Sequence, residues 1–327
     1  MNRIVIILFL VLPAAIPRAA TAQQLPIYSQ YLHNKFLINP AVAGSDGYTT
    51  LNLTAREQWA GYSGAPRTFS FSAQTRILKS SHRIRDVRGR RVYRPGSDGR
   101  VGLGGYIFND RNGAILRTGI QSSYSYHIWL YPETQLSFGL AFTGYHFRIN
   151  ERELTFEDQN EPWLTNDLRR GIFVPDFSFG MHVLNARYSA GFAAEQLFES
   201  FGRLGSDAYS GFRMKRHYNL FATYNISTSL YSELQPSAMA RISDHMIPQF
   251  DFGLTYMYND EFWAGMAYRT GGAVIANVGV MFQNIFMGYS FDFTTQEIQR
   301  MTYGTHEIVI AIRYGDSRRR YRWLDRY

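Results

Sequence analysis

Apolar and polar side chains alternate at every second position along most of the chain after residue 47. In residues 249–258, the sequence QFDFGLTYMY places Phe, Leu and Tyr on one face and Asp, Gly, Thr and Met on the other. Such alternation predicts β-strands with one apolar and one polar face. About fourteen segments have this pattern, near residues 48–58, 67–77, 100–108, 116–130, 134–147, 175–184, 187–197, 216–226, 230–241, 249–258, 261–269, 273–282, 285–293 and 305–315.

Strand length separates two architectures that fit this pattern, a soluble β-sandwich or propeller array and a transmembrane barrel. Soluble strands average about five or six residues, whereas membrane-spanning strands need about 9–11, and most of the segments reach that length. The polar faces carry mainly small residues, as a wet lumen requires, and the apolar faces are rich in Phe and Tyr, as lipid contact requires. The pattern therefore predicts an all-β fold, a transmembrane antiparallel β-barrel of about 14 strands.

The connections between the segments alternate between short and long. With a periplasmic N-terminus, the short periplasmic turns are Leu130–Thr134, Leu184–Arg187, Ile226–Ser229, Tyr258–Glu261 and Phe282–Ile285. The outward set includes the long stretches Arg148–Val174, Phe198–Lys215 and Thr294–Gly304. Short periplasmic turns and long outer loops are typical of outer-membrane barrels. One periplasmic connection, residues 78–100, is long instead.

Residues 1–22 have the pattern of a cleaved secretory signal peptide. Arg3 precedes an apolar stretch at residues 4–16, and Ala20-Thr21-Ala22 supplies the small-x-small cleavage pattern. The alternative, an anchor helix that stays attached, is disfavoured because the apolar stretch is short and contains Pro13. We therefore expect an exported chain with an N-terminal periplasmic segment at residues 23–47, a barrel at residues 48–315 and a basic periplasmic tail at residues 316–327.

Composition and charge add a possible docking surface. The chain is 45% hydrophobic and 16% aromatic, too apolar for a disordered chain, and its net charge is +8 at pH 7. Residues 78–100 contain eight basic and two acidic residues, and residues 313–327 contain six basic and two acidic residues. We predict that the first cluster, including Arg88, Arg90 and Arg91, docks an acidic periplasmic partner electrostatically. The alternative is a solvated charged rim. Export excludes nucleic acid as a partner.

No residue pattern indicates catalysis. The chain has no cysteine, which excludes disulfides, thiolate metal sites and cysteine nucleophiles, and its eight histidines are scattered. A barrel hydrolase would need a Ser and a His close together with an acid that orients the imidazole, and the predicted strands provide no such set. We expect no enzyme activity, no cofactor and no metal. An outer-membrane lipid-modifying enzyme is the least favoured alternative.

Two loops break the barrel pattern and are candidate partner-binding sites. Trp59, Gly61, Gly64 and Pro66 predict a compact first hairpin loop with an aromatic anchor. The long loop Arg148–Val174 holds two further candidates, Phe156 and Trp163, among charged residues, a mixture that suits binding interfaces. We expect it to contact an exported partner together with Phe198–Lys215. The alternative is an ordinary lid over the lumen.

Ten motifs in order resemble the PorP/SprF family, the outer-membrane barrels of the Bacteroidetes type IX secretion and gliding machinery. They are spread from about Tyr28 to Tyr314, and no single one is decisive. The motifs are YSQY, NPAVAGS, REQWAGYSGAPRTFSFS, GLGGYIFNDRNG, LSFGLAF, HYNLFATY, QPSAMARI, FWAGMAYR, MGYSFD and THEIVIAIRY.

The resemblance implies a monomeric barrel that attaches proteins and performs no chemistry. Its expected partners are a secreted surface protein with a C-terminal sorting domain, a periplasmic peptidoglycan-associated lipoprotein and outer-membrane lipids. It also implies that residues 28–45 form a plug-like segment in or under the barrel, and that the loop from Trp59 to Pro66 faces outward. The long basic connection at residues 78–100 and the basic tail depart from the family pattern. A diffusion or substrate-specific transport barrel is the alternative function.

Overall fold

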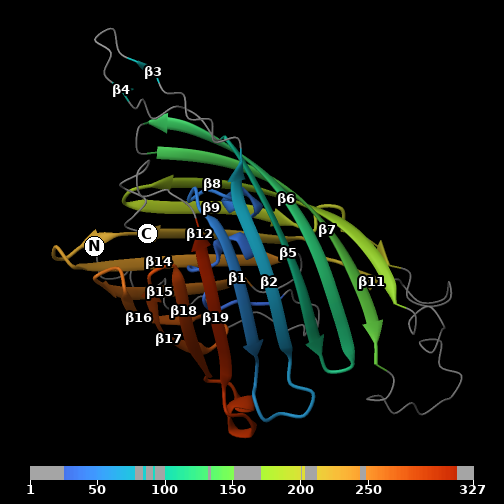
Figure 1. Cartoon of the computed structure of the whole chain (residues 1–327). Helices are drawn as coiled ribbons and strands as arrows, with labels where there is room; N and C mark the ends of the chain where they lie inside the picture. Colours follow the sequence, from blue (N-terminus) through green and yellow to red (C-terminus); the bar gives the residue numbers. More distant parts are fainter. Residues whose placement is uncertain are drawn as a thin grey trace, which may run out of the picture.

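Fourteen antiparallel strands form one sheet that closes on itself, because β12 pairs with β14 as well as with β9 (Figure 1). The computed structural model describes residues 26–77, 84–85, 91–92, 100–131, 134–150, 171–199, 201–202, 212–243 and 248–314. The barrel strands are β1 (Thr49–Glu57), β2 (Arg67–Ile77), β5 (Val101–Asn112), β6 (Ile115–Tyr131), β7 (Thr134–Ile149), β8 (Ile172–Asn185), β9 (Tyr188–Glu195), β12 (His217–Tyr224), β14 (Ser232–Ser243), β15 (Gln249–Tyr258), β16 (Phe262–Arg269), β17 (Ala273–Phe282), β18 (Ile285–Thr294) and β19 (Thr305–Tyr314). The short β13 (Ile226–Ser227) continues the line of β12 along β14. The predicted all-β barrel of about 14 strands is confirmed.

The first and last barrel strands lie side by side. β1 pairs with β19 from Thr49↔Tyr314 to Glu57↔His306, so one end of the barrel, here named the terminal end, holds the start of β1 and the finish of β19. The opposite end is named the loop end. Short turns join β6 to β7, β8 to β9, β15 to β16 and β17 to β18 at the terminal end, as the sequence predicts. The long connection from β2 to β5 contains a separate pair of two-residue strands, β3 (Ile84–Arg85) and β4 (Arg91–Val92).

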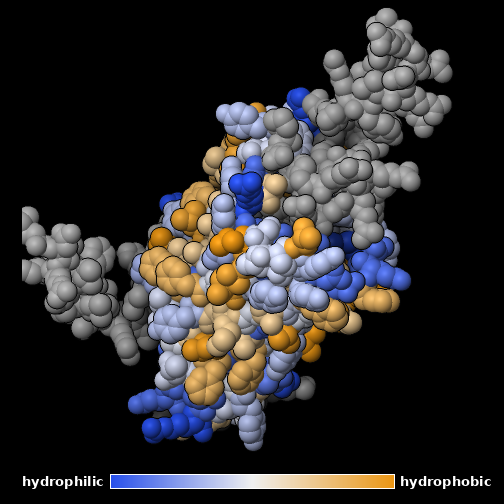
Figure 2. All heavy atoms as spheres, turned by 90° about the vertical axis from the view of Figure 1, so that its left-hand side faces the viewer, coloured by the Kyte–Doolittle hydropathy of each residue, from blue (hydrophilic) through white to orange (hydrophobic). Residues whose placement is uncertain are grey.

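Large apolar side chains cover the outside of the barrel wall. In β2, Phe69 and Phe71 are 54% and 48% exposed, whereas the alternate Ser70 and Ser72 are buried. On the face that Figure 2 shows, apolar residues gather across the middle and hydrophilic residues lie toward the edges. Water contact penalises such surface by about 25 cal/mol per Å². The wall is therefore suited to lipid.

No helix among the described residues is long and apolar enough to cross a membrane.

Strand β5 extends further than the sequence pattern predicts. The pattern predicts that a strand ends near residue 108 and that Asn109–Gly113 forms a turn, but β5 continues to Asn112. Only Gly113, with a φ of 56°, and Ala114 connect β5 to β6. Asp110 is tolerated inside the strand because its carboxylate accepts hydrogen bonds from Thr68 at 2.7 Å and Arg117 at 2.9 Å.

Residues 26–47 lie inside the barrel and contain two short 3-10 helices, η1 (Lys35–Leu37) and η2 (Pro40–Val42). Residues of this segment form hydrogen bonds with inward-facing side chains of strands on opposite sides of the barrel, among them β2, β6, β9 and β19. Apolar side chains of this segment pack with two strand residues to form a buried cluster. The cluster consists of Tyr31, Phe36, Ile38, Val42, Ala43, Phe221 and Met239. The interior is thus packed around a piece of the chain itself.

Candidate functional site

Trp59, Gly61, Gly64 and Pro66 lie together in the β1–β2 loop at the loop end. Gln58 N donates to Pro66 O at 2.8 Å and closes the loop. Trp59, Gly61 and Gly64 have φ values of 55°, 87° and 73°. Only glycine adopts positive φ freely, so the conformation of Trp59 is strained, and strained residues concentrate at functional sites.

This loop is joined to the β18–β19 loop, which contains the 3-10 helix η5 (Glu297–Met301). Ala60 N donates to Gly304 O, and Tyr303 N donates to Ala60 O, both at 2.8 Å. A Cβ atom on Gly61 would lie 2.6 Å from the Tyr303 ring, so the ring packs where only glycine fits. Tyr303 and Met301 remain 79% and 71% exposed, and Tyr62 beside them is 47% exposed. These three side chains are named the rim platform.

The other predicted partner-binding residues fall mostly outside the described part of the chain. Phe156 and Trp163 of the long outer loop lie there, as do Arg88 and Arg90 of the basic connection. Arg91 is described only through its backbone, which pairs with that of Arg85 in the β3–β4 sheet. The predicted signal peptide at residues 1–22 and the predicted periplasmic tail at residues 316–327 also lie outside the described residues.

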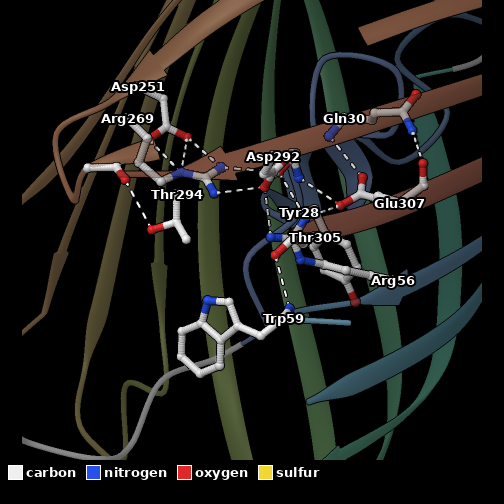
Figure 3. Close-up of polar contacts among 12 residues, drawn as sticks. Tyr28, Gln30, Arg56, Trp59, Asp251, Arg269, Asp292, Thr294, Thr305 and Glu307 are labelled. Carbon is white, nitrogen blue, oxygen red and sulfur yellow. Dashed lines mark hydrogen bonds and ion pairs between the residues drawn. The ribbon is translucent and has the colours of Figure 1, made fainter. Parts of the chain in front are cut away.

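An ion-pair network crosses the barrel interior near the loop end (Figure 3). Arg269 bridges two carboxylates, Asp251 at 3.0 Å and Asp292 at 3.4 Å. Arg56 bridges Asp292 and Glu307, each at 2.9 Å. Arg241 pairs with Asp251 at 3.1 Å and extends the network to β14. These three arginines and three carboxylates are named the charged wall.

The strand register brings the charged wall together. Arg56 of β1 and Glu307 of β19 are direct partners across the junction of the first and last strands. Arg269 of β16 and Asp251 of β15 are direct partners as well. All of these charges occupy inward positions, where sequence alternation predicted a polar residue but gave no sign of its partner. Across the described ranges, no group of His, Asp and Glu side chains is arranged to hold a metal ion.

The charged wall binds the backbone of the interior segment. The two carboxylate oxygens of Glu307 accept from the backbone N–H groups of Ser29 at 2.8 Å and Gln30 at 2.9 Å. Gln30 Nε2 donates to the backbone oxygen of Glu307 at 3.0 Å. Ser29 Oγ donates to Asp292 at 2.5 Å and accepts from Arg56 at 2.8 Å. Hydrogen bonds to charged groups are among the strongest that proteins form, so two consecutive residues are held firmly.

The opposite wall receives the segment through small residues. Five consecutive strands place small inward residues in one continuous register, here named the small-residue lane: Gly102, Ser125, Gly139, Gly180 and Ala193. A Cβ atom on Gly139 would lie 2.3 Å from Ala41 N, and one on Gly180 would lie 2.1 Å from Asn39 Oδ1. The lane therefore leaves the space that η2 and its flanking residues fill.

Polar side chains in the lane and beside it bind segment backbone too. Ser125 Oγ donates to Ala43 O at 2.6 Å, and Arg76 Nε donates to Gly44 O at 2.9 Å. In the reverse direction, Asn39 Nδ2 donates to two strand carbonyls, those of Met181 at 2.9 Å and Phe192 at 3.1 Å. The segment NPAVAGS is thus recognised by its turn conformation and by its close backbone approach.

His33, a residue of the interior segment, packs its ring against two aromatic side chains of the wall. Its ring centroid lies 4.8 Å from that of Trp263 and 4.7 Å from that of Phe286. Burial, together with the nearby charges of Arg313 and Lys35, lowers the pKa of His33 to about 3. The imidazole is therefore uncharged at neutral pH.

The family is decided by the sequence model of the type IX secretion system membrane proteins PorP/SprF, which matches residues 20–312. The chain belongs to the PorP/SprF family. This confirms the resemblance carried by the ten motifs. Family and barrel together place this PorP/SprF protein in the outer membrane, as a membrane component of type IX secretion that interacts with its machinery and cargo.

Solved structures similar to this PorP/SprF protein are distant. A Pseudomonas aeruginosa FadL homologue shares 11% identity, with 84% of this chain and 91% of that chain covered and a TM-score of 0.42. The Acinetobacter baumannii outer membrane protein Omp33 shares 5% identity, with 82% of this chain and 100% of that chain covered and a TM-score of 0.44. A mutant of the monoaromatic hydrocarbon channel TodX shares 11% identity, with 86% of this chain and 92% of that chain covered and a TM-score of 0.44. No curated protein matches the chain.

Proposed function

We propose that this PorP/SprF protein is a non-enzymatic attachment component of type IX secretion. It holds a secreted surface protein with a C-terminal sorting domain, links to a periplasmic peptidoglycan-associated lipoprotein, or does both. The observation that carries the proposal is the contrast between interior and rim. The interior is occupied by residues 26–47, whereas Tyr303 and Met301 at the loop end are 79% and 71% exposed on a loop fixed by backbone hydrogen bonds.

The rim platform suits the exported partner. Exposed aromatic and Met side chains are enriched in binding interfaces, and a preformed surface loses little conformational entropy when it binds. The basic connection at residues 78–100 is the corresponding candidate for an acidic periplasmic partner. Transport is the alternative function, because polar inward faces could also line a passage. Ion conductance of the purified barrel in a planar bilayer would favour transport.

An affinity pulldown of the tagged barrel from its native cell tests attachment. We expect the double variant Tyr303→Ala and Met301→Ala to recover at least about tenfold less sorting-domain protein, since interface aromatics often contribute 1.4 kcal/mol or more, roughly a factor of ten. Tyr231→Ala is the matched control, because Tyr231 is 64% exposed and lies between β13 and β14 at the terminal end. Equal recovery by both variants would exclude the rim platform as the cargo contact. Recovery of a periplasmic lipoprotein alone would favour the second link.

A further inference from the structure

The interior segment runs from the loop end toward the terminal end. Ser29 and Gln30 bind Glu307, the third residue of β19 from the loop end. Gly44 O binds Arg76, which is the second-last residue of β2 at the terminal end. The segment then reaches β1 at Thr49, so its tethered side is at the terminal end. Its other side, residues 28–30, lies on the same end of the barrel as the rim platform.

The two parts of the segment are held by different forces. Residues 31–47 contribute Tyr31, Phe36, Ile38 and Val42 to the buried apolar cluster, and residues 39–43 fit the small-residue lane. Residues 28–30 form hydrogen bonds to Arg56, Asp292 and Glu307, and Tyr28 adds one buried ring. Removal of the first part would expose apolar surface to water, whereas removal of the second part exchanges hydrogen bonds with protein for hydrogen bonds with water.

The charged wall remains neutral when the segment is absent. Its three arginines and three carboxylates already pair with one another through strand residues alone. The departure of Ser29 and Gln30 therefore leaves no buried charge without a counter-charge, the condition that makes a broken buried ion pair costly. The wall can hold this part of the segment and can also release it.

We propose that residues 28–30 are a releasable latch, seated on Glu307 near the loop end of the lumen. When the latch is seated, it covers the charged wall. When it is released, residues 31–47 stay anchored and the inward face of β18 and β19 becomes open to water from the loop end. The latch lies close to the rim: Trp59 N donates to Thr305 Oγ1 at 3.2 Å, and Thr305 is the next inward residue of β19 beside Glu307.

A single cysteine can report release, because the chain has none of its own. Ser290 faces inward on β18 with 0% exposure, between Gly288, which contacts Gln30, and Asp292, which binds Ser29. The reporter Ser290→Cys is nearly isosteric. We would measure its rate of labelling by a water-soluble maleimide in the folded, detergent-solubilised full-length mature barrel.

Glu307→Gln in the reporter background should increase the labelling rate about tenfold or more, because the latch loses a charged acceptor. Glu57→Gln is the matched control: Glu57 also pairs with an arginine, Arg67 at 2.7 Å, but that pair is exposed at the rim. The control should label at the parent rate. Equal rates for Glu307→Gln and Glu57→Gln would overturn the latch.

Two segment variants keep the test decisive if Glu307→Gln does not fold. Ser29→Pro removes the backbone N–H group that donates to Glu307 and changes no strand residue. The reporter in this variant should also be labelled about tenfold faster or more. Deletion of residues 26–30 should give the fastest labelling. A deletion variant that labels at the parent rate, or that cannot form the barrel, would overturn the proposal. No partner takes part in these measurements, so the attachment function can fail while the latch stands, and the reverse.

Discussion

The two walls that hold the interior segment use opposite means. The charged wall has long, ionised side chains on β14, β15, β16, β18, β19 and β1, and it binds two residues of the segment by hydrogen bonds. The small-residue lane on β5 to β9 has almost no side chains, and it accepts the segment by leaving space for its backbone. One wall therefore depends on charge balance and the other on shape.

This difference separates release from anchoring within one short peptide. A charge network that is balanced within the wall tolerates the loss of its peptide, since its members still pair with one another. A close-packed groove gives no such alternative, because each atom of the peptide fills space that nothing else occupies. Changes to the two walls should therefore differ in size and in kind.

The largest effect is expected where the charge balance is broken. Arg269→Met leaves Asp251 and Asp292 with one arginine each, and loss of one member of a buried ion pair costs about 3–5 kcal/mol. Arg67→Met, at the exposed pair with Glu57, should cost no more than about 1 kcal/mol. Urea unfolding of the two variants in detergent gives the comparison. Similar losses of unfolding free energy for both variants would mean that the charged wall is as well solvated as the rim.

The next effect concerns the lane. Gly139→Ala places a methyl group 2.3 Å from Ala41 N and 2.5 Å from Ala41 Cα, and overpacking of this kind costs about 1–3 kcal/mol. Gly105→Ala is the control on the neighbouring part of the sheet, because its nearest atom would be Gln121 O at 3.1 Å. Gly139→Ala should lower the temperature at which the barrel unfolds on a gel more than Gly105→Ala does. The reverse order would show that the segment is not seated on the lane.

The sequence pattern predicts the strands, but it does not predict which residues pair to form either wall. Alternation follows from neighbouring residues, so all fourteen strands and their outward faces could be predicted. Arg56 and Glu307 are 251 residues apart and meet only because the barrel closes between β1 and β19. The small-residue lane likewise exists only once the register of five strands is known. Asp110 was placed in a turn for the same reason, since its partners lie on adjacent strands.

The rim shows the same limit of sequence reasoning. Trp59, Gly61 and Gly64 stand out locally because Trp and repeated Gly break the strand pattern. Tyr303 gave no such signal, although it packs on Gly61 and is 79% exposed. A functional surface assembled from two distant loops becomes recognisable only when the first and last strands are known to be neighbours.

A smaller effect is expected from acid, at His33. The pKa of His33 is about 3 when the segment is seated, below its ordinary value of 6.5, because the ring is buried. The free state therefore binds a proton first, and the stability contributed by the neutral ring is full above pH 6.5 and declines as the pH falls from 6.5 toward 3. His33→Gln should reduce this decline, measured as the difference between unfolding free energies at pH 7 and pH 4.5. An identical decline in the variant would assign it to the carboxylates.

The smallest effect is the coupling between the two walls, and it decides whether the segment acts as one body or as two. If residues 28–30 are released while residues 31–47 stay anchored, Glu307→Gln and Gly139→Ala disturb separate parts. Their free-energy changes should then add to within about 0.5 kcal/mol in a double-mutant cycle. If the segment leaves as a single body, the first mutation already removes what the second would disturb, and the double variant should be less destabilised than the sum by about 0.5–3 kcal/mol. Urea unfolding of the four proteins distinguishes these cases, because additivity leaves the lane occupied after the charged wall has released its part of the segment.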